Sequence, residues 1–275
     1  MQTRTRPHAK PRTRVAGTRT PVGVAALAVL GIAFVVLPLV AIVAQAPWSR
    51  AWGVLNSETT RTALRLSIVV ATCAASVDLL LGVPVAFVLA RAQFPGKRVV
   101  RALAVLPLVL PPVVAGVGLL AALGRRGLLG GVLGAIGVQL PFTTAGAVVA
   151  TAFVSFPLVV LAVESGLRSM DTRLETAART MGARPWHVMR RVTLPLLVPQ
   201  IVAGAVLAWA RALGEFGATL MFAGNLRGTT QTLPLAVFEV SQTDPKGALF
   251  IALVLVVISV AVLVVTLRGR LLESR

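Results

Sequence analysis

Long uncharged stretches dominate this chain and limit what it can fold into. They lie at about residues 20–49, 66–90, 102–124, 127–163, 192–210 and 247–267, with Asp78 as the one charge inside the second stretch. Each is close to or longer than the roughly 20 residues that a helix needs to cross about 30 Å of hydrocarbon. None shows the two-residue alternation of membrane β-barrels. The sequence therefore predicts an all-α polytopic membrane protein.

Composition agrees with this fold class, because 56% of the residues are hydrophobic and 13% are charged, against roughly a quarter charged in soluble domains. We predict six transmembrane helices near residues 22–46, 62–89, 99–123, 143–167, 194–220 and 248–267. Residues 1–20 carry six Lys and Arg and no acidic residue, which indicates a basic cytoplasmic tail. The first stretch could instead be a cleaved secretory signal, but it is longer than the usual apolar region of one.

The net charge of +18 could suggest a nucleic-acid partner, but the 27 Lys and Arg are unevenly distributed between the two sides of the predicted helices. With both termini inside, nineteen of them fall on cytoplasmic segments, seven on the opposite side, and Arg211 inside a span. This asymmetry follows the positive-inside rule of membrane proteins. Membrane topology therefore accounts for the excess of basic residues. We expect the chain to contact membrane lipid and not to bind nucleic acid.

The inventory of reactive side chains excludes most enzyme classes. Cys73 is the only cysteine, and His8 and His187 are the only histidines, so we expect no metal site and no Cys/His catalytic pair. No lysine is followed by Ser or Thr, so the chain lacks a P-loop. We therefore expect no catalytic residue and no cofactor in this chain. If ATP drives the protein, a partner chain hydrolyses it.

Glycine and proline interrupt several of the apolar stretches. Pro107, Pro111 and Pro112 lie inside the third predicted helix, where we expect them to kink it. They could line a pathway, or they could reflect only the general abundance of proline in membrane helices. Residues 124–140 read as a partly helical outer loop, and residues 225–246 as a polar outer loop.

The longest internal cytoplasmic connection, residues 169–193, predicts two short helices. Asp171 can cap the first helix, and Glu175 lies near its positive end. Gly182 suits the left-handed residue that stops a helix, and Pro185 is accepted in the first turn of the next one.

One face of the first short helix is apolar. Its members fall at helical spacing: Leu174, Ala177, Ala178 and Met181. The segment is too short and too charged to enter the bilayer, so this face needs a partner. That partner could be a separate protein or the ends of the chain's own helices.

These residues resemble a known motif. The stretch Glu175-Thr-Ala-Ala-Arg-Thr-Met-Gly182, followed by Leu194-Pro195, is similar to the EAA loop of type I binding-protein-dependent ABC importer permeases. In the general family pattern a Glu directly precedes the two alanines, whereas this chain has Thr176 there. The resemblance implies that residues 169–193 dock on an ATPase. The coupling residues that it implies are Asp171, Leu174, Glu175, Ala177, Ala178, Met181, Gly182, Leu194 and Pro195.

Further stretches resemble the molybdate branch of this family: residues 106–116, 124–130, 210–219, 222–225 and 228–234. The resemblance covers about residues 61–268. It implies an importer of molybdate or tungstate with two copies of this permease, two ABC ATPase subunits and an extracytoplasmic binding protein, in the plasma membrane of a bacterium. Sulfate or thiosulfate is the runner-up substrate.

Three charged residues lie well inside the predicted helices, away from their ends. Arg211 and Glu215 are four residues apart, so they can pair on one helix face, and Asp78 stands alone. Because charges are costly at the bilayer centre, all three should face protein or water. Arg211 could attract an anion in the pathway, but tight binding halfway would slow release, which favours a structural ion pair. An ion-coupled carrier using Asp78 and Glu215 is the alternative from another class, and it leaves the Glu175–Pro195 pattern unexplained.

Overall fold

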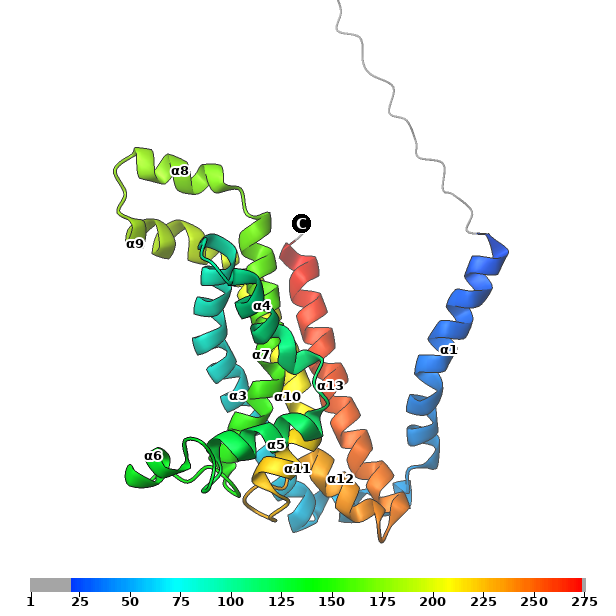
Figure 1. The fold of residues 1–275 in the computed structure, drawn as a ribbon. Helices are drawn as coiled ribbons and strands as arrows, with labels where there is room; N and C mark the ends of the chain where they lie inside the picture. Colours follow the sequence, from blue (N-terminus) through cyan, green and yellow to red (C-terminus); the bar gives the residue numbers. More distant parts are fainter. Residues whose placement is uncertain (1–20, 274–275) are drawn as a thin grey trace, which may run out of the picture. The chain divides into compact units, whose positions relative to one another are not determined.

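The structure is a computed structural model that describes residues 21–273, and all its regular elements in this range are helices (Figure 1). The predicted all-α fold is therefore confirmed. The basic tail, residues 1–20, lies outside the described residues. The chain divides into two units, residues 1–44 and 45–275, which are described separately.

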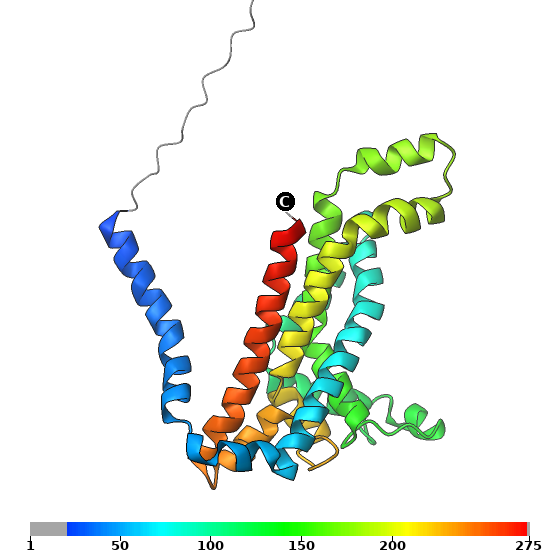
Figure 2. The ribbon, with the colours of Figure 1, turned by 180° about the vertical axis from the view of Figure 1, so that it is seen from behind.

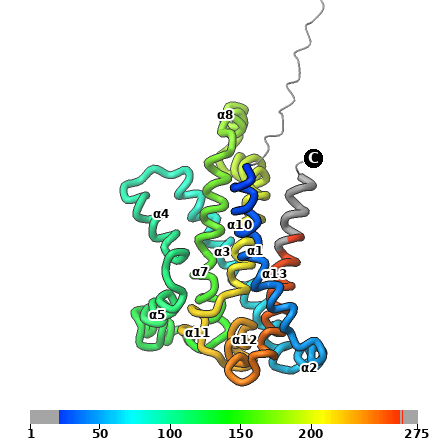
Figure 3. Tube along the Cα trace, turned by 90° about the vertical axis from the view of Figure 1, so that its right-hand side faces the viewer, coloured from blue at the N-terminus to red at the C-terminus, as the bar shows by residue number. Residues whose placement is uncertain are grey.

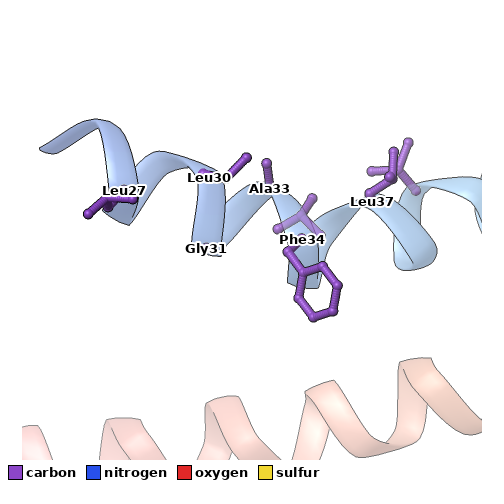
Figure 4. A pocket seen from close by; sticks show the side chains of 8 residues that line it. Leu27, Leu30, Gly31, Ala33, Phe34 and Leu37 are labelled. Carbon is purple, nitrogen blue, oxygen red and sulfur yellow. The ribbon is translucent and has the colours of Figure 1, made fainter. Parts of the chain in front are cut away.

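The first unit contains helix α1, Val22–Gln45, which is long and apolar enough to cross a membrane. Its side chains include Leu27, Leu30, Phe34 and Leu37, which are 66–81% exposed and project from the helix (Figure 4). Such a surface is suited to lipid, because apolar side chains have no free-energy penalty for contact with the hydrocarbon of a bilayer. This helix matches the predicted span at residues 22–46.

Three long helices form the centre of the second unit: α3 (Glu58–Arg91), α7 (Thr144–Ser169) and α10 (Leu194–Leu213). Side-chain caps fix the starts of two of them, since Ser57 accepts from the Thr60 amide and Thr143 accepts from the Gly146 amide. Figure 2 shows these helices running side by side through the unit. Their shared core includes Leu89, Val159 and Leu197, all buried.

Small residues allow α7 and α10 to approach closely. A Cβ added at Gly166 would lie 2.6 Å from the Cγ of Gln200, and one at Gly204 would lie 3.2 Å from the Cα of Val159. Close backbone approach through glycine is the usual way in which membrane helices gain packing contacts.

The third predicted span is not one kinked helix, and this expectation was wrong. Helix α4 (Lys97–Val105) and the short turn η2 (Leu106–Leu108) meet helix α5 (Pro112–Leu123) at 115°. Two consecutive prolines explain the break. Pro111 takes an extended conformation (ψ 130°) because Pro112 follows it, and neither residue has an N–H to continue the ladder. Pro107 lies within η2 and is buried.

The fifth predicted span is also interrupted. Helix α10 ends at Leu213, and a separate helix α11, Gly217–Ala223, follows after a break at residues 214–216. Helix α11 packs against α5, so the two broken spans meet at the end of the unit far from α8 and α9 (Figure 1). A continuous apolar pattern concealed this break.

The connection at residues 225–246 is not a simple polar loop. It contains helix α12, Leu233–Ser241, whose Leu233, Leu235 and Ala236 are fully buried. The loop at residues 124–140 contains the short helix α6, Gly130–Ala135, as expected. The segment before α3 forms η1 (Trp48–Arg50) and α2 (Ala51–Asn56).

The last helix, α13, spans Pro245–Glu273. Its start is joined to η1 by an exposed ion pair, in which the Arg50 guanidinium lies 3.1 Å from the Asp244 carboxylate. Among the described residues, five helices are long and apolar enough to span a membrane, and the broken pair α4/α5 raises the number to six if it counts as one span. The six predicted spans therefore all have a counterpart, of which the third is the broken pair and the fifth ends at Leu213 instead of residue 220.

Candidate functional site

The segment between α7 and α10 forms a helical hairpin that projects beyond one end of the central helices (Figures 1 and 2). It consists of α8 (Thr172–Thr180), α9 (Pro185–Val188) and the π-helix η3 (Met189–Thr193), which leads directly into α10. We call residues 171–193 the hairpin. Its position at the end of the bundle leaves both short helices accessible to another protein.

Local sequence rules explain the ends of these helices. The Asp171 carboxylate accepts a hydrogen bond from the Arg173 amide at 2.9 Å and caps α8. Gly182 has φ +85°, the left-handed conformation expected of a residue that ends a helix. Pro185 lies in the first turn of α9, and Pro195 in the first turn of α10 after Leu194.

The apolar face predicted on α8 is divided in the structure. Ala178 is buried, whereas Leu174 and Met181 are 50% and 82% exposed, and Ala177 is exposed as well. The chain's own helices therefore cover only part of this face. The exposed part is a surface of small and apolar side chains that a partner protein can approach.

Glu175 is the one acidic residue of the hairpin that is buried. Its Oε1 accepts from Nη2 of Arg91 at 3.0 Å and from Oγ1 of Thr193 at 2.8 Å. Arg91 is the last residue of α3, and Thr193 is the last residue of η3. We call these three residues the latch, because they join α8 to α3 and to the start of α10.

The latch was not predicted, since the sequence indicates only that Glu175 lies near the positive end of α8. Its partners are 84 and 18 residues away in the chain, beyond the reach of helical spacing rules. One feature of the sequence could have indicated the latch: the Glu lies at position 175, one residue before the position of Thr176 where the family pattern has it. That displacement moves its carboxylate to the inner face of α8, beside the buried Ala178.

A second acidic residue is buried at the same end of the unit. Glu164 of α7 is 1% exposed, and its carboxylate lies 2.7 Å from Nη2 of Arg168 and 3.2 Å from Nε of Arg101. This pairing holds α4 against α7, although the two arginines are about half exposed.

Arg211 and Glu215 form the ion pair that their spacing allows, at 2.8 Å. Glu215 is 2% exposed and lies in the break after α10, not on a continuous helix. Its other oxygen accepts from the Ala218 amide at 2.8 Å, which caps the first turn of α11. The pair therefore stabilises the broken fifth span at its turn.

Asp78 is fully buried in α3. Its Oδ2 accepts from Oγ of Ser155 on α7 at 2.5 Å, and its Oδ1 has no hydrogen-bond partner. The carboxyl group borders a cavity of about 410 Å³ that is otherwise apolar, between α3, α4, α5 and α7. The structure thus places Asp78 in the packing between α3 and α7.

Replacing Ser155 with alanine should destabilise the fold, because it removes the only hydrogen bond that the described part of the chain makes to the fully buried carboxyl group of Asp78. The expected cost is about 1–3 kcal/mol, measured as a lower thermal unfolding midpoint in detergent. Ser76→Ala is the matched control, since Ser76 is exposed on α3 and bonds only the Thr72 carbonyl. Equal midpoints for the two variants would show that the Ser155 bond contributes nothing.

At the opposite end, a polar cluster closes the connection between α11 and α12. Glu239 accepts hydrogen bonds from Arg227, Gln231 and Asn225. The hydrogen bond from Arg227 is the main reason why the pKa of Glu239 is lowered, so its carboxylate stays charged well below neutral pH. Asn225 and Gln231 belong to the stretches that carry the family resemblance, so the cluster gives those residues a structural role.

Comparison with known proteins identifies relatives over most of the chain. The family described as binding-protein-dependent transport system inner membrane component matches residues 79–275. The molybdenum transport system permease protein ModB of Mycobacterium tuberculosis is 48% identical over 235 residues, which cover 86% of this chain and 89% of the relative. ModB of Escherichia coli is 47% identical over 186 residues, covering 67% and 81%. The sulfate transport system permease protein CysW of Synechococcus elongatus is 36% identical over 239 residues, covering 84% of each chain.

Solved structures support the same fold. A bacterial ABC transporter involved in the import of the acidic polysaccharide alginate aligns with a TM-score of 0.68 at 17% identity, covering 92% of this chain and 94% of that one. The MetNI methionine ABC transporter in an inward-facing conformation aligns with a TM-score of 0.61 at 18% identity, covering 77% and 96%. At such identities the likeness shows the fold alone.

Proposed function

The chain belongs to the family of binding-protein-dependent transport system inner membrane components, and from this premise we propose that it is the permease subunit of an ATP-driven molybdate importer. The identity of 47–48% to molybdenum permeases supports this substrate over sulfate, for which the relative is 36% identical. Tungstate is the second substrate that we expect, because it is a tetrahedral dianion of similar size. Import of sulfate remains the second candidate function.

We expect this subunit to work within a complex in the bacterial inner membrane. Two copies form the pathway, two ABC ATPase chains bind on the cytoplasmic side, and an extracytoplasmic protein delivers the anion. Closed twofold assembly is the commonest symmetry of oligomers and suits a pathway between two permeases. The chain is a permease and not an ATPase, so the hydrolysis of ATP belongs to the partner.

The hairpin is the observation that carries the mechanism. Its α8 projects from the bundle with Leu174, Ala177 and Met181 exposed, so we propose that this surface docks on the ATPase and that this end faces the cytoplasm. Movement of α8 can reach α10 through η3 and can reach α3 through the latch. Movement of the ATPase domains would then tilt α3 and α10 together. This tilting would open the pathway first to one side of the membrane and then to the other.

The charged residues of the spans have a structural role in this proposal. Arg211 forms an ion pair with Glu215, and Glu215 also accepts a hydrogen bond from the α11 backbone. These contacts favour a role for Arg211 in holding the turn, and not a role as a binding site for the transported anion. Asp78 faces α7 and an apolar cavity, a poor environment for a permeating dianion. An ion-coupled carrier would need these carboxylates in an aqueous path.

The decisive experiment measures ATP hydrolysis by the permease reconstituted with its cognate ATPase and binding protein. We expect stimulation by molybdate and tungstate and none by sulfate. Stimulation by sulfate alone would move the assignment to the sulfate branch. Failure of any ATPase to copurify with the permease would overturn the importer function and favour an ion-coupled carrier.

A further inference from the structure

The apolar cavity beside Asp78 has no part in the proposed transport cycle. It has a volume of about 410 Å³ and is lined by residues of α3, α4, η2, α5 and α7. Asp78 is the one charged residue among those that line it. Sites for small ligands have this character, since they are mostly apolar with a few polar groups that orient the ligand.

The Asp78 carboxyl group is only half satisfied by the protein. Its Oδ2 accepts from Oγ of Ser155 at 2.5 Å, and its Oδ1 has no hydrogen-bond partner within residues 21–273. The side chain is fully buried, so bulk water does not reach it, and no Lys or Arg of the described residues pairs with it. A buried carboxyl group without a counter-charge is costly. A ligand with a positively charged hydrogen-bond donor would remove this cost.

The remaining walls of the cavity favour an apolar body on the same ligand. Phe153 and Phe156 of α7 line one side, and Pro107 and Leu119 line another. Hydrocarbon gains free energy by packing against such side chains, and aromatic rings also attract cations. The walls and Asp78 together therefore suit a molecule with an apolar chain and a single cationic end.

The cavity can be reached from the lipid phase. Leu81 of α3 and Leu103 of α4 line it and are 54% and 60% exposed. Helix α4 lies at the edge of the unit beside α7, on which it mainly packs (Figure 3). Asp78 is about 20 Å along α3 from the end of that helix at Arg91, well inside a span. An apolar amine dissolved in the bilayer can therefore approach between α3 and α4.

We infer that this cavity is a binding site for small apolar amines, which bind as ammonium ions with the charged group at Asp78 and the alkyl chain among the side chains of α5 and α7. Charge decides between this ligand and the transported substrate, because the one charged group of the cavity is acidic and a dianion would be repelled. A plain lipid acyl chain would fill the apolar part but leave Oδ1 of Asp78 without a donor. The site is thus distinct from the anion pathway.

The test compares three probes with the same alkyl chain: hexylamine, hexanol and hexanoate. Binding to the full-length permease in detergent is measured by equilibrium dialysis, with the uptake by protein-free detergent subtracted. We expect hexylamine to bind most tightly, hexanol about tenfold more weakly, and hexanoate not at all. The Asp78→Asn variant should lose about tenfold in affinity for hexylamine and keep its affinity for hexanol. Hydrogen bonds to charged groups are worth about this factor.

Two further variants keep the inference falsifiable. Ala104→Phe leaves Asp78 unchanged but fills the cavity, in which Ala104 is a half-buried lining residue, so it should weaken the binding of hexylamine and hexanol alike. Asp171→Asn is the matched control, because it removes a carboxylate outside the cavity and should change nothing.

Equal binding of hexylamine by the unmodified protein and Asp78→Asn would overturn the inference. If Asp78→Asn does not fold, unchanged binding to Ala104→Phe would overturn it in the same way. Hexanol binding as tightly as hexylamine would assign the cavity to uncharged apolar molecules such as acyl chains, and tight binding of hexanoate would assign it to anions. None of these measurements depends on which anion is transported or on the presence of an ATPase.

Discussion

Replacing Gly182 with valine should abolish most anion-stimulated ATP hydrolysis while leaving the permease inserted in the membrane. Gly182 has φ +85°, a conformation that costs a residue with a Cβ about 1–2 kcal/mol and a β-branched one more. The strain comes from the backbone and not from crowding, because nothing lies within 4 Å of an added Cβ. The turn between α8 and α9 would therefore change, and α8 would no longer meet the ATPase in the required orientation. We expect roughly a tenfold loss of molybdate-stimulated activity, assayed in the reconstituted complex.

Gly182→Asn is the matched control, since asparagine tolerates the left-handed conformation far better than valine. Because there is space for either side chain, the two variants differ mainly in backbone strain. We expect the asparagine variant to keep most of the activity. Comparable losses in both variants would show that the surface at residue 182 matters and not the conformation of the turn. Normal activity of the valine variant would contradict the coupling role of the hairpin.

The parts of the fold that the sequence predicts correctly follow from local rules. Long apolar stretches give the spans. In the hairpin, Asp171, Gly182 and Pro185 each mark a helix end through their own backbone or side-chain chemistry. These signals act within four residues, so one sequence is enough to read them.

The features of the fold that the sequence does not predict depend on contacts between residues that are far apart in the chain. Single prolines such as Pro84 and Pro157 remain inside continuous helices, whereas the pair Pro111-Pro112 breaks the span by 115°. Apolarity is the same in both cases, so hydropathy cannot distinguish a kink from a break. Helix α12 was missed for a related reason: Leu233 and Ala236 are buried in a cluster with Ala63 of α3 and Ile251 of α13, and the segments on either side of α12 are polar.

The latch shows the same limit for a functional side chain. Glu175 can be placed on α8 by periodicity, but its partners come from the end of α3 and the end of η3. Only the folded arrangement brings Arg91 and Thr193 to it. Their contacts give the hairpin a second connection to the central helices, besides the chain itself.

Replacing Glu175 with alanine should therefore uncouple ATP hydrolysis from the anion. The change leaves the Arg91 guanidinium without its carboxylate and the Thr193 hydroxyl without its acceptor, both at the base of the hairpin. Removing a hydrogen-bonded partner at a buried site costs about 1–3 kcal/mol, and we expect the lower part of this range because the Arg91 side chain is 34% exposed. The ATPase still docks on the exposed part of α8. We expect basal hydrolysis to persist, while stimulation by the loaded binding protein falls about fivefold to tenfold.

A double-mutant cycle distinguishes this connection from a general loss of stability. If Arg91 and Glu175 act as a pair, the Arg91→Ala/Glu175→Ala double variant should be barely worse than either single variant. Asp171→Ala is the matched control, because it removes an acidic residue of the hairpin that caps α8 and has no contact with α3 in the latch. The Asp171→Ala variant should have a slightly lower thermal unfolding midpoint, and stimulation of ATP hydrolysis should fall much less than in the Glu175→Ala variant. Strictly additive losses for Arg91 and Glu175 would mean that the two residues act separately. The pull of the ATPase would then reach the spans only through the chain itself, at the end of α7 and through η3 into α10.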